Sequence, residues 1–151
     1  LLPAYRRRQG VLVRTDDPRF ENVATAEELL LQAVANKDCL MVNRNQGSGT
    51  RVLTDMLLEQ LGIATLPPGY STQSRSHHAV AAAIRQGRAD WGIAIEGVAT
   101  GLRFAPLRDE QYDFVVPQAR TRRRAVVALQ QLLECQETQD ALSKLGLELH
   151  R

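Results

Sequence analysis

The segment from Cys39 to Leu61 restricts the fold more strongly than any other part of the sequence. The apolar run Cys39–Val42 predicts a buried strand, and apolar side chains then recur at helical spacing from Thr50 to Leu61, just before Gly62. Only a short, polar, glycine-rich turn separates the two. A buried strand that leads through a short turn into an amphipathic helix is the building unit of α/β proteins, so this segment predicts an α/β fold.

Other segments extend this pattern on both sides. Thr25 stands three residues before Glu28, which predicts a helix that starts with a capping box. Ser76 and Gly87 mark the start and the end of another helix. Further strands are predicted at 11–13, 91–95, 104–107 and 112–116, with a polar turn at 108–111, and further helices at about 125–133 and 137–145. We therefore predict a mostly parallel sheet that binds ligands beyond the carboxyl ends of its strands.

The turn between the first strand–helix pair predicts an anion-binding site. Gly47 and Gly49 let the backbone approach a ligand, and Ser48 and Thr50 supply hydroxyl groups. The free N–H groups of the following helix point to the same place, where the helix dipole favours negative charge. The residues predicted to contact the ligand are Asn43, Arg44, Gly47, Ser48, Gly49, Thr50 and Arg51.

The same turn has a simpler interpretation, in which Ser48 or Thr50 only caps the helix and the glycines form a tight turn. The turn is not a P-loop, because it lacks the ending G-K-[ST]. It is not a nucleophile elbow either, because G-S-G-T does not match G-x-S-x-G. These absences remove two enzyme classes and leave anion binding and simple capping open.

A second polar helix start lies at Ser76 and His77. The Ser76 hydroxyl and the N–H groups beyond it face the same ligand if the two turns are neighbours, and His77 adds a further donor; a packed or solvated histidine is the alternative. A metal site formed by His77 and His78 is not expected, because neighbours in sequence point apart on a helix and no third ligand is evident. His150 is expected to be a solvated tail residue.

Composition limits the class of protein. The chain of 151 residues has 44% hydrophobic and 24% charged residues, as in a soluble globular protein, and no apolar run approaches the roughly 18 residues that span a bilayer. The start of the chain lacks the order of a signal peptide. Cys39 and Cys135 lie far apart and are expected to be reduced thiols, which fits a cytoplasmic protein. The net charge of +2 does not by itself imply a nucleic-acid partner, and the arginine clusters at 6–8 and 120–124 are expected to be solvated.

Three blocks in this order carry a resemblance to a known family: N-R-x-x-G-S-G-T-R, then S-H-x-A-V-A-A-A-I-x-x-G-x-A-D-W-G-I-x-I-E, then F-x-P-L-x-x-E-x-Y-D-F-V-V-P. Together they resemble the periplasmic-binding-protein-like domain family. Its molybdate- and tungstate-binding members are found fused to winged-helix regulators and to molybdopterin-biosynthesis proteins of the MoeA type. The chain is also similar to the effector-binding domain of LysR-type regulators. The resemblance covers about 7–145.

This resemblance implies a type II binding-protein fold, in which two α/β lobes joined by two crossing strands hold a ligand in the cleft. Residues 15–103 are then one complete ligand-binding lobe, and residues 1–14 and 104–151 are the hinge strands and a partial second lobe that includes the C-terminal helices. The crossing strands are Gln9–Arg14 and Phe104–Val116. Most of the second lobe is expected to precede residue 1, so the chain resembles a fragment or a truncated paralogue.

The resemblance also assigns positions to the cleft. It implies that Gly47, Ser48, Gly49, Thr50 and Arg51 line the ligand side, that Ser76 and His77 form the second helix start, and that Glu96 and Tyr112 lie near the hinge. Glu96 is expected to have a structural role, because a carboxylate repels an anion. His78 departs from the family, in which an apolar residue is usual at this position.

The main functional hypothesis is a binding or sensing domain, not an enzyme, for a tetrahedral oxyanion such as molybdate or tungstate, linked to molybdenum cofactor metabolism or to transcriptional regulation. The alternative is a small organic effector, which requires apolar walls from Tyr70, Trp91 or Tyr112. A triad of Ser48, His77 and Asp90 matches no known motif. No cofactor or catalytic metal is expected.

The expected partners are the small anion and an upstream lobe or fused domain of the same protein. A membrane partner is not expected, and nucleic acid is expected only through an unseen fused domain. An exposed half-cleft also favours self-association as a homodimer.

Overall fold

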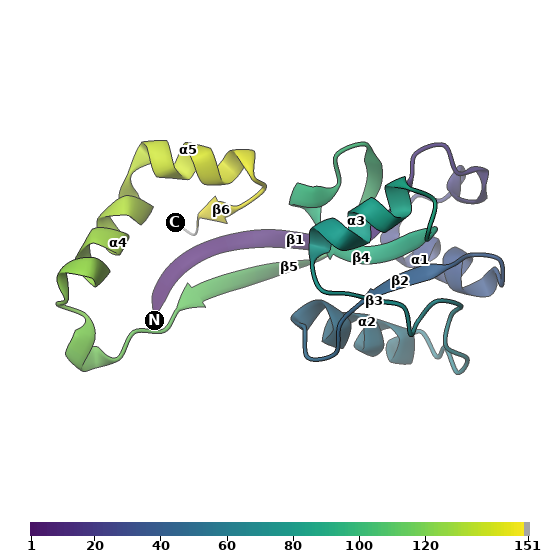
Figure 1. Cartoon of the computed structure of the whole chain (residues 1–151), viewed down its shortest axis with the longest axis horizontal. Coiled ribbons are helices and arrows are strands. Elements are labelled where there is room, and N and C mark those ends of the chain that lie inside the picture. The colour runs from purple at the N-terminus through teal and green to yellow at the C-terminus, as the bar shows by residue number, and fades with distance from the viewer. Residues whose placement is uncertain (150–151) are drawn as a thin grey trace. The chain divides into compact units, whose positions relative to one another are not determined.

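The computed structural model describes residues 1–149, so His150 lies outside the described residues. The chain forms two compact units, one of Gln9–Arg108 and one of Leu1–Arg8 with Asp109–Arg151. It passes from one unit to the other within β1 (Leu2–Arg14) and again within β5 (Leu102–Phe114) (Figure 1). The assignment of residues 15–103 as a ligand-binding lobe stays a prediction, and each unit is described here by itself.

The sheet of the larger unit has the strand order β3-β2-β4-β1-β5. The strands β2 (Met41–Arg44), β3 (Gln73–Ser74) and β4 (Trp91–Ile95) are parallel, whereas β1 runs antiparallel to β4, with Val13 opposite Trp91. The α/β fold is confirmed, but a mostly parallel sheet was predicted and only the β3-β2-β4 half is parallel. The antiparallel half arises because β1 and β4 are not joined as a simple strand–helix–strand unit.

Alternating side chains divide this unit into two cores. Val11 and Val13 face the core formed with α1 (Ala26–Ala35) and α2 (Gly49–Gln60), whereas Leu12 between them faces the core formed with α3 (His77–Arg85). All three of these β1 residues are fully buried. Helices therefore cover both faces of the sheet (Figure 1), which is why its strands are apolar on both sides.

The helix boundaries follow the capping residues. The predicted capping box at Thr25 is confirmed: its hydroxyl accepts the Glu28 N–H at 3.1 Å, and the Glu28 carboxylate accepts the Thr25 N–H at 3.1 Å. After α2 and α3, Gly62 and Gly87 have φ values of +67° and +69°, in the left-handed region that glycine adopts without strain.

The C-terminal crossing segment differs from the prediction made from local patterns, whereas the crossing strand at 104–116 that the resemblance implied corresponds to β5. Two strands at 104–107 and 112–116 were predicted with a polar turn at 108–111 between them, but β5 runs without a break from Leu102 to Phe114. Polar side chains do not end a strand whose backbone pairs with a neighbour, and β5 lies beside β1 in the sheet. Glu110, in the predicted turn, accepts from Arg7 of β1 at 2.7 Å. For the same reason β1 is much longer than the predicted 11–13.

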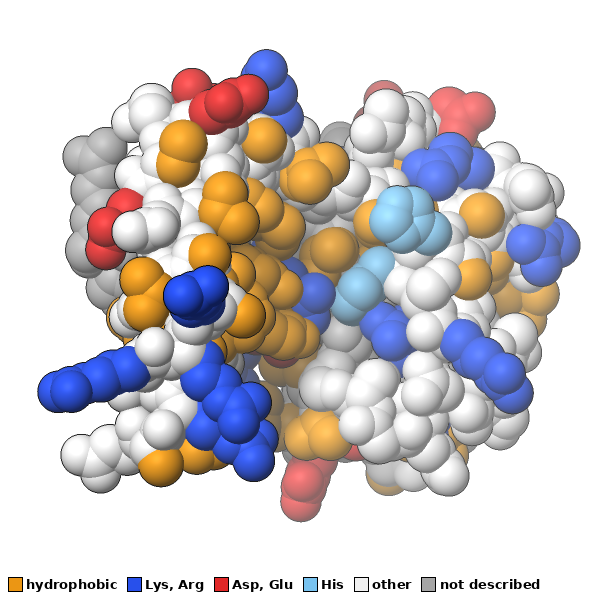
Figure 2. Space-filling view, turned by 60° about the vertical axis from the view of Figure 1, so that its left-hand side comes forward, with side chains coloured by type: hydrophobic (Ala, Val, Ile, Leu, Met, Phe, Trp, Pro, Cys, Tyr) orange, Lys and Arg blue, Asp and Glu red, His pale blue; other side chains and the backbone are white. Residues whose placement is uncertain are grey.

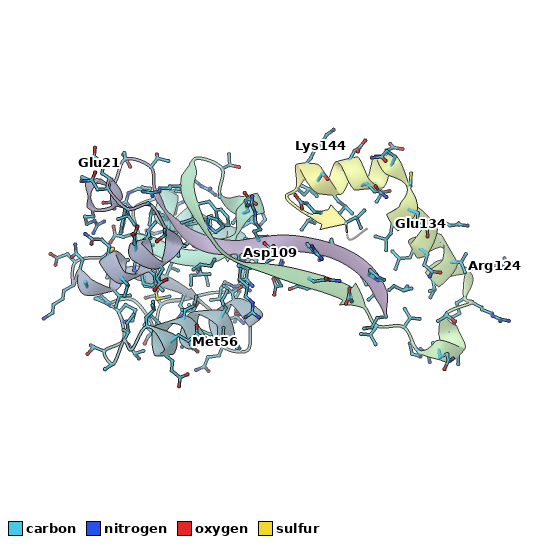
Figure 3. All side chains as sticks on the ribbon, turned by 180° about the vertical axis from the view of Figure 1, so that it is seen from behind. Glu21, Met56, Asp109, Arg124, Glu134 and Lys144 are labelled. Atoms are coloured by element: carbon cyan, nitrogen blue, oxygen red, sulfur yellow. The ribbon has the colours of Figure 1, made fainter. Side chains whose placement is uncertain are left out.

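The smaller unit contains the outer parts of β1 and β5, then α4 (Arg124–Glu134), α5 (Gln136–Lys144) and the short strand β6 (Glu148–Leu149), which pairs with β1. The 3-10 turn η3 (Gln118–Arg120) precedes α4. Both helices were predicted, yet no residue of either is buried. Figure 3 labels Arg124, Glu134 and Lys144 on these two helices. Among the described residues, no helix is long and apolar enough to cross a membrane.

Candidate anion-binding site

Two helix starts lie side by side at one edge of the larger unit's sheet. Because β2 and β3 are parallel neighbours, the turns that follow them leave the same edge (Figure 1). Hydrogen bonds join the turns: the Asn45 N–H donates to the Ser74 carbonyl at 3.1 Å, and the Gln46 N–H donates to the Gln73 side chain at 3.4 Å. The starts of α2 and α3, predicted separately, therefore belong to one surface.

The Ser48 side chain caps α2. Its hydroxyl accepts the Arg51 N–H at 3.2 Å and donates its own proton to the Asn45 carbonyl at 2.9 Å. A hydroxyl has one proton to donate, so in this geometry Ser48 holds the turn and has no proton left for a ligand. Ser76 caps α3 in a similar way, since its hydroxyl accepts the Ala79 N–H at 3.1 Å.

The donors at the start of α2 are backbone groups. The N–H groups of Gly49 and Thr50 have no hydrogen-bond partner in the described part of the chain, as expected for the first turn of a helix. Gly47, with φ of +82°, precedes them, and no atom lies within 4 Å of the place where a Cβ would stand. The open space at Gly47 leaves these donors approachable, and the helix dipole adds positive potential there.

The two arginines of the turn differ in what holds them. Arg44 connects the two turns, because its Nε donates to the Ser74 carbonyl at 3.2 Å. Arg51 is buried, donates through Nε to Asp55 at 3.0 Å and stacks over the Tyr70 ring at 4.2 Å. Burial acts to lower the pKa of Arg51, but the hydrogen bonds that its guanidinium group makes with Tyr70 and Asp55 outweigh this effect and raise the pKa. Asp55 balances the Arg51 charge, so this arginine anchors α2 to the loop that contains Tyr70.

Asn43 stabilises the turn through two hydrogen bonds inside the protein. It is 2% exposed, its Oδ1 accepts the Arg44 N–H at 2.9 Å, and its Nδ2 donates to the Tyr70 carbonyl at 3.3 Å. Both ends of the carboxamide are therefore occupied inside the protein. Direct ligand contact by Asn43 stays a prediction, while its bonding within the fold explains a buried polar residue at the end of β2.

The two histidines at the start of α3 have different exposure. His77 is half-buried and His78 is exposed. Figure 2 shows histidine side chains on a surface that also carries Lys or Arg side chains, which suits a negatively charged ligand. Within residues 1–149, no group of three His, Cys, Asp or Glu residues is arranged to hold a metal ion.

Of the aromatic residues named for an organic ligand, Tyr70 lies beside the start of α2, where its ring stacks on Arg51. Trp91 is fully buried in the core, and the Tyr70 hydroxyl donates to Asp55 at 2.7 Å. Tyr112 belongs to the smaller unit, where its ring stacks on Tyr5 at 5.3 Å between centroids and its hydroxyl accepts from Arg7. Within the larger unit, the surface around the helix starts is polar and rich in donors.

The residues of the imagined Ser48–His77–Asp90 triad are not assembled. Asp90 directly precedes β4, whereas Ser48 follows β2, and the two strands are parallel. The residues therefore lie at opposite edges of the sheet, separated by a strand length of about 15 Å. Asp90 instead accepts from Arg14 at 3.0 Å and from Arg19 at 2.6 Å. Sequence reasoning missed this ion cluster, because its members are up to 76 positions apart.

The comparisons with known proteins concern the family and the fold of the chain. A model of the PBP superfamily domain matches residues 1–134. Among curated proteins the chain is similar to the uncharacterized protein YvgK of Bacillus subtilis (strain 168), with 32% identity over 152 residues. The match covers 97% of this chain and 46% of YvgK, so the chain spans about half the length of the curated relative that it matches.

Two solved structures have a similar fold. One is the tungstate ABC transporter from Geobacter sulfurreducens, with a TM-score of 0.64, 16% identity, and coverage of 94% of this chain and 66% of that chain. The other is the tungstate binding protein TupA from Desulfovibrio alaskensis G20, with a TM-score of 0.59, 14% identity, and coverage of 99% and 71%. At these identities the likeness establishes the fold alone. With most of its length matched by the family model, this chain belongs to the PBP superfamily.

Proposed function

We propose that this chain binds a small anion at the paired starts of α2 and α3, and that the ligand is a tetrahedral oxyanion such as molybdate or tungstate. The observation that carries the proposal is the pair of unpartnered N–H groups at Gly49 and Thr50 beside an open Gly47. The proposed role is binding or sensing, not catalysis. The two tungstate-related proteins of similar fold support the choice of ligand.

The chemistry of the ligand agrees with the chemistry of the surface. A fully deprotonated oxyanion accepts hydrogen bonds and donates none, so it requires donors. Backbone N–H groups at a helix start supply donors at fixed positions together with favourable electrostatic potential. The Arg44 side chain, which bridges the two turns, adds positive charge at the same edge of the sheet.

The facing wall of the cleft is proposed to come from an upstream lobe of a longer protein. Two observations support this. The chain matches 46% of YvgK, and no residue of α4 or α5 is buried in the described structure. Helices with apolar stripes are ordinarily covered on one face. An upstream lobe packed on them would bury that face.

The test is calorimetric titration and thermal stabilisation with molybdate, tungstate, sulfate and phosphate. It uses this chain and, where the gene encodes an upstream segment, the longer form. Molybdate or tungstate is expected to bind more tightly than the other anions. Failure of every oxyanion to bind either form would overturn the proposal.

The matched variants are Gly49→Pro and Ala26→Pro. Both residues are the first of their helix, where proline removes one N–H but preserves the helix geometry. Gly49→Pro removes a proposed donor and should weaken oxyanion binding about tenfold or more. Ala26→Pro makes the same backbone change at the start of α1 and should leave affinity unchanged. Equal affinities of the two variants would show that the start of α2 is not the binding site.

A further inference from the structure

Gln9 is a buried polar residue to which no role has been given so far. It is 3% exposed, and its Oε1 has no hydrogen-bond partner in the described structure. Burying a carboxamide without a partner is unfavourable, and most buried side-chain amides are hydrogen-bonded. The next residues on the same face of β1, Val11 and Val13, are apolar. A polar residue that ends an apolar row needs a reason other than packing.

The register of β1 shows which face Gln9 occupies. Five consecutive residues, from Gln9 to Val13, pair in order with β4, so this stretch contains no bulge. Side chains of a regular strand alternate, and Gln9 therefore shares a face with Val11 and Val13. That face is covered by α1 and α2. The Gln9 carboxamide thus lies on the side of the sheet on which α2 begins.

The register also shows the level of Gln9 along the sheet. Gln9 is opposite Ile95, the last residue of β4, so it lies at the carboxyl edge of the parallel strands. β2, which leads into the α2 start, is two strands away in the order β2-β4-β1. Two strand spacings are about 10 Å, which a glutamine side chain and a bound tetrahedral anion span together.

We propose that Gln9 is a ligand-binding residue, which donates from its Nε2 to the same oxyanion that the start of α2 binds. This inference rests on the proposed function. Oε1 is sealed from solvent inside the protein, so the Nε2 end of the carboxamide is the one that an anion reaches. This neutral donor adds a contact from a strand across the sheet.

The test compares Gln9→Met and Gln9→Glu with the unchanged chain, with tungstate and molybdate as the probes. Gln9→Met keeps the length and removes the donor, so affinity should fall about tenfold. Gln9→Glu keeps the shape but replaces the donor by a negative charge, and the loss should be about a hundredfold or more. Gln32→Glu makes the same charge change at an exposed position of α1 and should bind like the unchanged chain.

Stability without ligand separates a binding residue from a structural one. Because Gln9→Met removes an unpartnered buried amide, its thermal midpoint without ligand should equal or exceed that of the unchanged chain. A lower midpoint, or unchanged tungstate affinity in Gln9→Met, would overturn the role of Gln9 alone. Equal or tighter binding by Gln9→Glu would also overturn it, since the ligand would then donate to this position. Failure of every oxyanion to bind the unchanged chain or its longer form would overturn this inference together with the proposed function.

Discussion

Both edges of the sheet in the larger unit contain polar groups, but the two edges differ in whether these groups have hydrogen-bond partners within the protein. At the amino edge of β4, Asp90 accepts from Arg14, from Arg19 and from the Leu40 N–H, so its carboxylate is paired on both oxygens. At the carboxyl edge, backbone donors at the start of α2 and the amide of Gln9 have no partner in the described chain. Polar groups that are paired internally stabilise the fold, whereas the unpartnered N–H groups at the start of α2 are available to a ligand.

Asp90→Ala tests the amino edge and should have the largest effect. It removes one acceptor from each of two guanidinium groups, which keep Asp17 as a partner, and the acceptor of the Leu40 N–H, so the free energy of unfolding should fall by about 2 kcal/mol. Urea denaturation measures the loss. Asp16→Ala, at an exposed neighbouring aspartate, is the control and should change stability by less than about 0.5 kcal/mol. A loss below about 1 kcal/mol in Asp90→Ala would show that the cluster is not stabilising.

The same cluster should make the fold sensitive to acid. The ordinary pKa of an aspartate is 3.8. A hydrogen bond from Arg19 lowers the pKa of Asp17. Burial acts to raise the pKa of Asp90, but hydrogen bonds from the Leu40 N–H and from both arginines outweigh it and lower the pKa. A lowered pKa in the folded state means stability that is present above the unfolded value and lost as the pH falls through the folded value. Stability should therefore drop between about pH 5 and pH 2.

Denaturant midpoints measured across this pH range test the assignment. Asp90→Asn abolishes the titration of one carboxylate, so its stability should depend less steeply on pH below about pH 5 than that of the unchanged chain. An unchanged pH dependence in this variant would mean that other acidic groups cause the acid sensitivity.

Ser48→Ala tests whether the Ser48 hydroxyl only caps α2 or also contacts the ligand at the carboxyl edge. The loss of a cap hydroxyl should lower the free energy of unfolding by about 1 kcal/mol. Because the Ser48 proton is directed to the Asn45 carbonyl, oxyanion affinity should fall less than in Gly49→Pro. Thr25→Ala removes the corresponding cap of α1 and should match the stability loss with no change in affinity. A larger affinity loss in Ser48→Ala than in Gly49→Pro would assign the ligand contact to the hydroxyl.

Thiol labelling has the smallest expected effect among these tests. It reports whether the amino edge of the sheet opens transiently and exposes Cys39. Cys39 is fully buried, and burial raises the pKa of its thiol to about 11, whereas Cys135 is exposed. In the native protein one thiol, that of Cys135, should react rapidly at pH 8, because a protonated and buried thiol is a poor nucleophile. Cys39 should react faster in Asp90→Ala. Rapid labelling of Cys39 in the unchanged chain would show that this edge opens without mutation.

Local signals in the sequence predicted much of the larger unit correctly. The capping box at Thr25 and the strand Trp91–Ile95 have the predicted positions. These features depend on neighbours within a few residues: a hydroxyl and a carboxylate three positions apart, or a run of apolar side chains that only a buried strand accommodates. The sequence also placed the glycine-rich turn between a strand and a helix.

Features that depend on pairing were missed. The continuous β5 and the two-residue β3 exist because a neighbouring strand supplies backbone partners, which no local composition reveals. The sequence predicted the helix starts at 50 and 76, and ligand contact there stays a prediction. It placed Gln9 only in a crossing strand, because the position of Gln9 at the carboxyl edge follows from pairing with Ile95.

The sequence by itself therefore determined the type of local unit and the presence of a donor-rich helix start. The tertiary structure decided which polar groups remain available. Ligand contact by Arg51 and Asn43 stays a prediction; the structure shows that Asp55 and Tyr70 bind Arg51 and that the Tyr70 and Arg44 backbone binds Asn43. Whether a polar group binds a ligand or supports the fold depends on whether distant segments satisfy its hydrogen bonds, and only folding brings those segments together.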